Sequence, residues 1–187
     1  MELRTAIQKR RSVRRYSDAK PNWRKIIEAI DFARFAPAAG NIFNLKFVLV
    51  NDDDTIKNLA EASQQSFVGT ARFVIVAVSD KSVMERSFGD IGGKYSSLQA
   101  GAAIQNVLLA LTEMGYVTTW VGYFSEEQVK EILSIPDEMS VQGIFPIGKE
   151  TKIKTTSKQK IELENILYFN KWKNKKMLPE TIPTDIS

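Results

Sequence analysis

The segment SLQAGAAIQNVLLALTEM, residues 97–114, constrains the fold of this chain more than any other segment. Apolar residues occur almost all round a helix of this sequence, and small residues follow one another from Ala100 to Ala103. A helix without a polar face is buried on several sides, and Gly115 is a residue type that commonly ends a helix. The sequence therefore predicts one central helix against which the other elements pack.

The segments on both sides of this helix alternate between helical and strand patterns. The 3.6-residue period predicts further helices at 2–10, 23–35, 55–63 and 126–134. Apolar runs predict strands at 46–51, 72–79, 117–122 and 141–148. Asn22 should cap the second helix, and Ser125 should form a capping box with Gln128. A length of 187 residues suits one domain, so we expect an α+β fold with a central mixed β-sheet flanked by helices.

The absence of histidine and cysteine excludes much chemistry. The chain has no imidazole base, no thiol nucleophile, no disulfide and no conventional zinc or iron–sulfur ligand set. It also lacks a P-loop motif and a G-x-G-x-x-G motif after a strand. If the protein is an enzyme, its chemistry must come from carboxylates and hydroxyls or from a bound cofactor.

The apolar runs are short, and the longest clean one is FVIVAV at 73–78. Such runs are far too short to span a bilayer. The N-terminal sequence MELRTAIQKRRS has neither the apolar core nor the cleavage site of a signal peptide. We therefore expect a cytoplasmic protein with no membrane partner.

Five basic side chains lie between Lys9 and Arg15, around a single serine. This cluster would suit a nucleic-acid arm, a membrane-surface patch, a binding site for a small phosphorylated ligand, or an ordinary solvated basic face. The net charge is only +4, and acidic residues are spread along the chain. A nucleic-acid-binding protein more often has a wide basic face, so we expect no nucleic-acid partner.

Five segments, in order, resemble the FMN-dependent nitroreductase family. They are RRSVRRY, FAPAAGN, AGAAIQNVLLAL, WVGYFSEEQVKEILSIP and KQKIELENILYFNKW, and the resemblance extends from about residue 7 to residue 172. It implies a nitroreductase-like fold and FMN as the cofactor, with NADH or NADPH as the electron donor. The flavin would then carry the chemistry, so no residue is predicted to be catalytic by itself.

The resemblance also implies how the basic segment is used. Arg10 and Ser12, with Arg11 between them, would bind the FMN phosphate, because guanidinium groups bind phosphate through paired, charge-assisted hydrogen bonds. Arg14 would reach the pyrimidine edge of the isoalloxazine and stabilise the reduced flavin. Lys160 takes the place of an arginine that binds the phosphate in the family, so this contact keeps its charge and loses the bidentate geometry.

Three further segments are implied to contact the flavin. In the first, a loop that touches the flavin of the neighbouring subunit, the matched positions are Pro37, Ala38, Ala39 and Asn41. Ala38 replaces the serine that is usual there, so only backbone contact is expected from it. Gln65, or its neighbour Gln64, would be a polar contact. Val121 and Gly122 would pass along the ring at flavin N5, where a residue without a Cβ allows close approach of the backbone.

The implied protein is a homodimeric oxidoreductase, with residues 1–169 as one FMN-binding domain and residues 170–187 as a tail on the partner subunit, in the manner of a domain-swapped dimer. Hydride from NAD(P)H would reach an electron-poor small-molecule acceptor, such as a nitroaromatic or a quinone, by a ping-pong mechanism. Three alternatives stay open. The acceptor could be an enone or a halogenated phenol, the chain could be a basic nucleic-acid-binding module, and the tail could be a frayed terminus.

Overall fold

The computed structural model describes residues 1–151 and 161–177. The chain divides into two compact units, Met1–Lys154 and Thr155–Ser187, which are described separately here. Lys160, one of the predicted phosphate contacts, lies outside the described residues.

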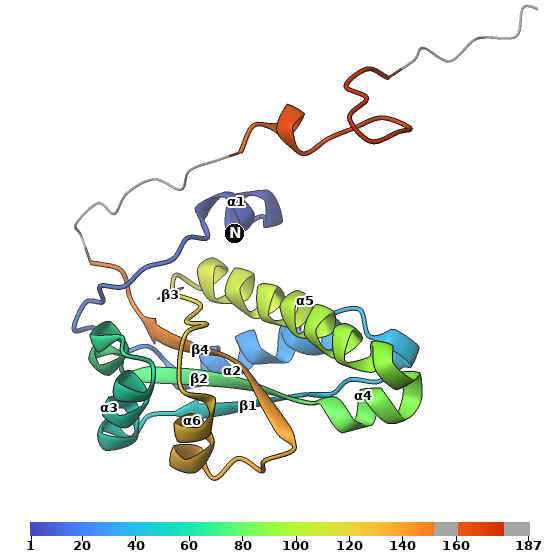
Figure 1. The fold of residues 1–187 in the computed structure, drawn as a ribbon. Coiled ribbons are helices and arrows are strands. Elements are labelled where there is room, and N and C mark those ends of the chain that lie inside the picture. The colour runs from blue at the N-terminus through green and yellow to red at the C-terminus, as the bar shows by residue number, and fades with distance from the viewer. Residues whose placement is uncertain (152–160, 178–187) are drawn as a thin grey trace, which may run out of the picture. The chain divides into compact units, whose positions relative to one another are not determined.

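The first unit is built on a four-stranded sheet (Figure 1). Its strands are β1 (Leu45–Val50), β2 (Phe73–Asp80), β3 (Val117–Thr118) and β4 (Met139–Gly148), in the order β1-β2-β4-β3. Neighbouring strands are antiparallel. A parallel bridge between Ser12 and Thr118 adds the N-terminal segment beside β3. The α+β fold class predicted from the sequence is confirmed, and β3 is shorter than the predicted strand at 117–122.

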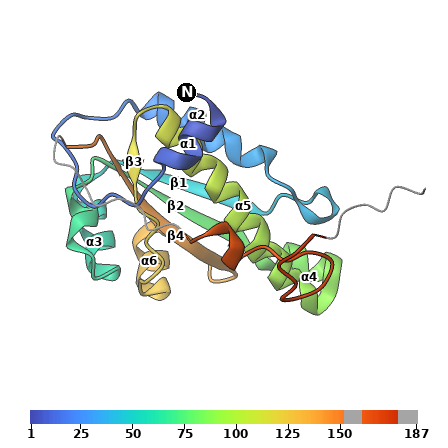
Figure 2. The same ribbon diagram turned by 90° about the horizontal axis from the view of Figure 1, so that it is seen from above.

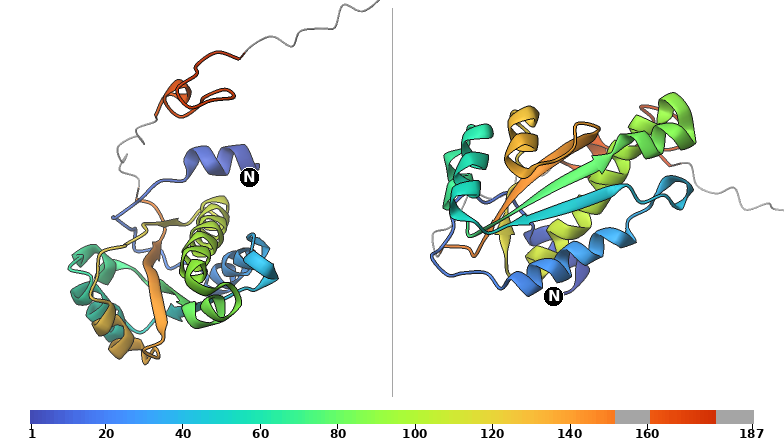
Figure 3. Two further views of the ribbon diagram at one scale, coloured as in Figure 1. Left: turned by 45° about the vertical axis from the view of Figure 1, so that its right-hand side comes forward. Right: turned by 90° about the horizontal axis from the view of Figure 1, so that it is seen from below.

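Helices cover both faces of the sheet, and β2 contributes to a core on each face. Phe73, Ile75 and Ala77 belong to the core that β2 shares with α2 (Trp23–Asp31) and α5 (Gly92–Glu113). The alternate residues, Val74, Val76 and Val78, belong to the core shared with α3 (Asp53–Ala62) and α6 (Glu126–Leu133). Because side chains alternate along a strand, a strand that is apolar at every position is buried on both faces. Figures 1 and 3 show the sheet between these two pairs of helices.

Helix α5 is the central helix that the sequence predicts, and it begins five residues earlier than predicted, at Gly92. Its buried face includes Ala103, Ile104 and Leu111, and Gly115 follows its C-terminus with a φ of 77°. The helix is not covered on every side, because Leu98 is 61% exposed in the single chain. Two shorter helices, α1 (Leu3–Lys9) and α4 (Lys81–Phe88), pack against it (Figure 2).

The described part of the second unit, residues 161–177, is a short segment with its own internal contacts. The rings of Tyr168 and Trp172 lie 4.6 Å apart, and Lys175 Nζ lies 4.0 Å from the centre of the Tyr168 ring. Trp172 is nevertheless 78% exposed, and Leu163 and Ile166 are about as open to solvent. This segment therefore leaves most of its apolar surface uncovered. Within the described residues of the chain, no helix is long and apolar enough to cross a membrane.

Candidate functional site

The N-terminal basic segment is fixed to the sheet through the backbone of Val13. The Val13 N–H donates to the Thr118 carbonyl at 3.0 Å. The Val13 carbonyl accepts two hydroxyl hydrogen bonds, from Thr119 Oγ1 at 2.7 Å and from Tyr16 at 3.1 Å. Burial raises the pKa of the Tyr16 phenol above its usual range, so this hydroxyl remains a donor at neutral pH. Three hydrogen bonds to one residue hold the segment in a single conformation.

The extended backbone around Val13 determines how its neighbours are presented. The Val13 side chain is buried, whereas Ser12 and Arg14 are exposed and Arg10 is half-buried. Within the described residues, neither Arg10 nor Arg14 is paired with a carboxylate. Arg11 differs, because it forms an ion pair with Glu150. Arg10, Ser12 and Arg14 therefore form the part of the segment that is available to an anion.

The turn that follows α3 meets the basic segment at Arg14. The Arg14 guanidinium lies 5.6 Å from the centre of the Phe67 ring, and Phe67 is packed against the core on this face of the sheet. Gln65, two residues before Phe67, donates its backbone N–H to the Ala60 carbonyl at 3.0 Å and is half-buried. Gln64 has a φ of 53° and is exposed. The predicted contacts at Arg14 and at Gln65 thus lie on two segments that touch each other.

The segment 120–125 approaches the same region from β4. Val121 exchanges two backbone hydrogen bonds with Ile144, at 2.9 and 3.0 Å, and is buried. Gly122 is exposed, and no atom outside residues 121–123 lies within 4 Å of the place where a Cβ would stand. The Ser125 N–H donates to the Ala62 carbonyl at 2.8 Å, which ties this segment to the end of α3.

Three segments that are distant in the sequence therefore converge at one end of the sheet: residues 10–14, 65–67 and 120–125. Together they present Arg10 and Arg14, which have no carboxylate partner among the described residues, exposed backbone at Gly122 and an amide side chain at Gln65. Such a surface can bind an anionic, planar ligand. Among the described residues there is no cluster of acidic side chains able to hold a metal ion.

The loop 37–41 lies elsewhere in the single chain. A Cβ on Gly40, which has a φ of 58°, would stand 2.9 Å from the Phe88 ring, so the loop packs against the end of α4. Pro37, Ala38 and Ala39 also line a shallow hollow beside α5. Asn41 is exposed and has a φ of 58°. Figure 2 shows α4 and this loop at the end of the sheet opposite to α3, so one chain does not bring residues 37–41 to Arg14.

Two supporting residues of the site were not identified from the sequence. In the sequence, Thr119 and Phe67 look like ordinary strand and turn residues. Thr119 bonds Val13, which is 106 residues away in the sequence. The Phe67 ring lies 5.6 Å from the Arg14 guanidinium. The local sequence carries no signal for either contact.

The fold and the site define an α+β protein with an exposed basic segment at one end of a helix-covered antiparallel sheet. The sequence profile of the nitroreductase family matches residues 7–68 and 59–149. The chain belongs to the nitroreductase family, which consists of oxidoreductases.

Individual relatives agree with this assignment. An NADH dehydrogenase from Thermus thermophilus is 28% identical in an alignment of 180 positions, which covers 79% of this chain and 86% of that protein. The crystal structure of a nitroreductase family protein from Clostridium novyi NT is 28% identical, with a TM-score of 0.74 over 93% of this chain and 96% of that one. The NADPH:FMN oxidoreductase from Vibrio harveyi, complexed with NAD⁺, has the same fold at 20% identity, with a TM-score of 0.80 over 92% of this chain and 78% of that one.

Proposed function

We propose that this chain is an FMN-dependent oxidoreductase. It takes hydride from NADH or NADPH and transfers the two electrons to an electron-poor organic acceptor, with the further proton coming from solvent. The observation that supports this most is the convergence of the Arg14, Gln65 and Gly122 segments on one open surface. A relative with the same fold is an NADPH:FMN oxidoreductase, and another is an NADH dehydrogenase.

The proposed phosphate contacts of the first unit are Arg10 and Ser12, and Lys160, which lies outside the described residues, stays a contact predicted from the sequence. Arg10 has no carboxylate partner among the described residues, so its charge is not already neutralised. A guanidinium and a hydroxyl can both donate to phosphate oxygens, and hydrogen bonds to a charged group are about twice as strong as neutral ones. Arg11, which is paired with Glu150, would contribute less than its neighbours.

At the other end of the proposed site, Arg14 and Gly122 would tune the redox properties of the bound FMN. When bound, FMN supplies the two-electron chemistry that the side chains of this protein lack. The Arg14 guanidinium would stabilise negative charge at the pyrimidine edge, and its contact with Phe67 restricts where it can lie. The exposed backbone at Gly122, with open space around it, would let the Gly122 N–H approach N5.

The proposed enzyme is a homodimer in which each site uses two chains. In one chain, residues 37–41 lie at the end of the sheet opposite to α3 (Figure 2), whereas Arg14 contacts Phe67 in the turn that follows α3. A second copy would therefore have to supply residues 37–41. Ala38 has no hydroxyl, so its contact would be made by the backbone. The exposed apolar side chains of the tail, such as Trp172 and Ile166, are suited to packing against the partner.

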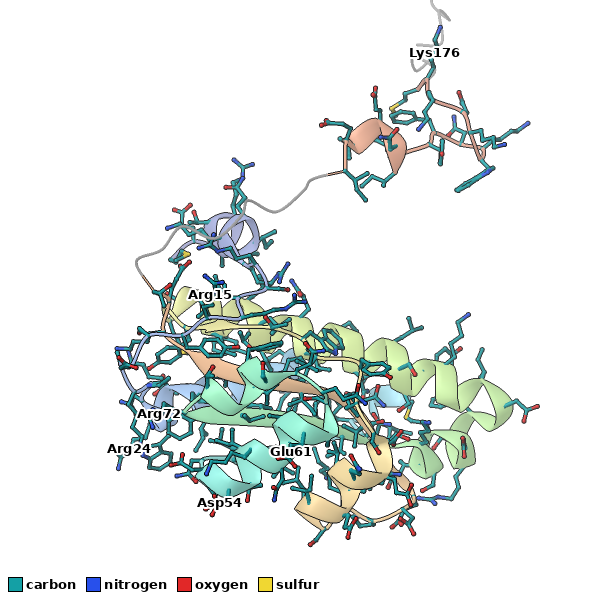
Figure 4. All side chains as sticks on the ribbon, turned by 60° about the vertical axis from the view of Figure 1, so that its left-hand side comes forward. Arg15, Arg24, Asp54, Glu61, Arg72 and Lys176 are labelled. Carbon is teal, nitrogen blue, oxygen red and sulfur yellow. The ribbon has the colours of Figure 1, made fainter. Side chains whose placement is uncertain are left out.

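The nucleic-acid alternative is less well supported by the charge distribution. Figure 4 shows Arg15, Arg24 and Arg72 on the same side of the first unit as Asp54 and Glu61. All of these residues are exposed. A surface of mixed sign gives weaker attraction to a polyanion than a continuous basic face.

The test is to purify the protein and measure its visible absorption and its affinity for FMN, followed by anaerobic reduction with NADH and with NADPH. We expect a flavin spectrum that is bleached by at least one nicotinamide. Arg10→Ala should bind FMN more weakly, and Arg24→Ala, which removes an equal charge from α2, should not. A colourless protein that fails to bind added FMN would refute the proposal. A panel of nitroaromatics, quinones, enones and halogenated phenols then identifies the acceptor class.

A further inference from the structure

A buried glutamine on α5 pairs with the backbone at the exit of the loop 37–43. Gln99 is 3% exposed. Its Oε1 accepts a hydrogen bond from the Asn44 N–H at 3.0 Å, and its Nε2 donates to the Ile42 carbonyl at 2.8 Å. A neighbouring β-strand offers one acceptor and one donor in a similar way. The amide of Gln99 therefore takes the place of a strand partner for residues 42–44.

Asn44 strengthens the same connection from the side of the loop. Its Nδ2 donates to the Asp80 carbonyl at 2.9 Å and to Ser96 Oγ at 2.8 Å, and Asn44 is itself 3% exposed. Ser96 and Gln99 lie one turn apart on α5, so the helix binds the loop exit at two points. Buried hydrogen bonds of this kind are costly to break because the groups left behind have no access to water.

Gln99 also lies beneath the residues that the proposed function assigns to the partner's flavin. With Pro37, Ala38 and Ala39 it lines a hollow of about 340 Å³, whose other walls are Tyr95, Leu98 and Ala102. We propose that Gln99 is a positioning residue, which holds the loop 37–43 in the conformation that binds flavin across the dimer. This inference rests on the proposed function for the flavin contact, but the pairing of Gln99 with the loop does not.

Gln99→Glu tests the inference by changing one atom. A carboxylate still accepts from the Asn44 N–H but has no donor for the Ile42 carbonyl, so two acceptors would face each other in a buried place. A protonated carboxyl regains one O–H donor, and burial raises the pKa of a carboxyl. The defect of this variant should therefore be largest at high pH and should decrease on acidification.

Other titratable groups lie near the loop exit, but they are also present in the control variant, so a pH dependence specific to Gln99→Glu is assigned to the new carboxyl. Tyr95 lies on α5, and Asp80 caps α4. The hydrogen bond from the Ser82 hydroxyl lowers the Asp80 pKa, so Asp80 stays ionised over a range of about pH 5.5 to 8. The other charged residues of β1 and of the segment 81–94 are exposed: Lys46, Lys81, Glu85, Arg86, Asp90 and Lys94.

The experiment measures the FMN dissociation constant and the amide hydrogen exchange of residues 37–44, the latter in FMN-free protein, from about pH 5.5 to 8. The matched control is Gln128→Glu, which adds the same charge at an exposed position of α6. We expect Gln99→Glu to weaken FMN binding about tenfold at pH 8, and to come within about threefold of the control at pH 5.5. At pH 8, the amides of residues 37–44 should exchange faster in Gln99→Glu than in the unaltered protein. Gln99→Met, which removes both hydrogen bonds without adding charge, should weaken binding equally at every pH.

The outcomes separate the two proposals. If Gln99→Glu and Gln99→Met leave both the loop amides and FMN binding unchanged, the inference about Gln99 is wrong. If the loop amides exchange faster while FMN binding stays the same, Gln99 holds the loop but the loop does not contact flavin, which overturns the positioning role. If the unaltered protein does not bind FMN at all, the proposed function fails, and the hydrogen-exchange result still decides whether Gln99 holds the loop.

Discussion

Replacing Gly143 by alanine should destabilise the protein and weaken FMN binding at the same time. Gly143 lies within β4, opposite Ala77, where the register of β2 and β4 shifts. A Cβ on Gly143 would stand 2.5 Å from Trp120 Nε1 and 2.8 Å from Phe145 Cζ. Real Cβ atoms do not approach other atoms so closely, so both aromatic side chains would have to move.

The size of the effect follows from what Trp120 would lose. Its Nε1 donates to the Gln142 carbonyl at 3.1 Å, and its ring lies 5.4 Å from that of Phe145. Overpacking costs about 1–3 kcal/mol, and loss of the hydrogen bond costs about 0.5–1.5 kcal/mol. We therefore expect the free energy of unfolding to fall by about 1.5–4.5 kcal/mol. Movement of Trp120 would also displace Gly122, two residues further on.

Urea unfolding of FMN-free protein and FMN titration, both at fixed protein concentration, measure the two effects. The control is Gly93→Ala, because no atom lies within 4 Å of the place where a Cβ on Gly93 would stand. Gly93 is the second residue of α5, where alanine should raise stability by less than the roughly 0.5–1 kcal/mol of a mid-helix position. If Gly143→Ala unfolds at the same urea concentration as the unaltered protein and binds FMN equally well, the position of Trp120 does not depend on the missing Cβ at Gly143, and the reasoning is refuted.

The other predictions concern the basic segment, α4 and the tail. Arg10→Ala should chiefly weaken FMN retention, by about 1.5–3 kcal/mol, and Arg14→Ala should chiefly lower the flavin midpoint potential; equal effects on retention with no change in potential would contradict these roles. Asp80→Ala should lower the melting temperature near neutral pH by removing the α4 cap. The Ser82 hydrogen bond lowers the Asp80 pKa, so this difference should begin to decrease as the pH falls below about 4 and should continue to decrease through the lowered pKa of the folded protein; a difference that does not decrease in acid would refute it. Deleting residues 170–187 should cause aggregation or loss of FMN, and a folded, yellow monomer would show that the tail is dispensable.

The core of the fold could be predicted from the sequence because its signals are local. The strand at 72–79 is apolar at almost every position, and such a strand must be covered on both faces; the structure confirms this. Asn22 caps α2 as predicted, since its side chain accepts from the Arg24 N–H. Ser125 accepts from the Gln128 N–H at 3.4 Å, which is the first half of the predicted capping box. The Ser125 N–H donates to the Ala62 carbonyl at 2.8 Å and not to the Gln128 side chain, so the second half of the box is not formed.

The candidate site was only partly predictable, because its geometry depends on contacts between distant segments. Composition drew attention to the basic cluster at 9–15, and the family resemblance singled out Arg10 and Arg14 within it. Composition does not reveal that Arg11 is paired with Glu150, 139 residues away, or that Val13 is bound by Thr119. The flavin contacts of all the predicted residues stay predictions, and the loop 37–41 shows why: its position relative to Arg14 depends on a second chain.

The lack of histidine and cysteine agrees with the way this site is built. General acid–base catalysis needs a group whose pKa lies near the working pH. The Tyr16 phenol donates to the Val13 carbonyl, and burial raises its pKa further away from neutral pH. What the described residues do supply is fixed geometry: Val13 holds the arginine segment through three hydrogen bonds, and Gln99 holds the loop 37–43 through two. Preorganised charges and dipoles stabilise a developing charge without reorganisation. A redox group that brings its own chemistry requires this kind of support, and it does not require a tuned acid or base.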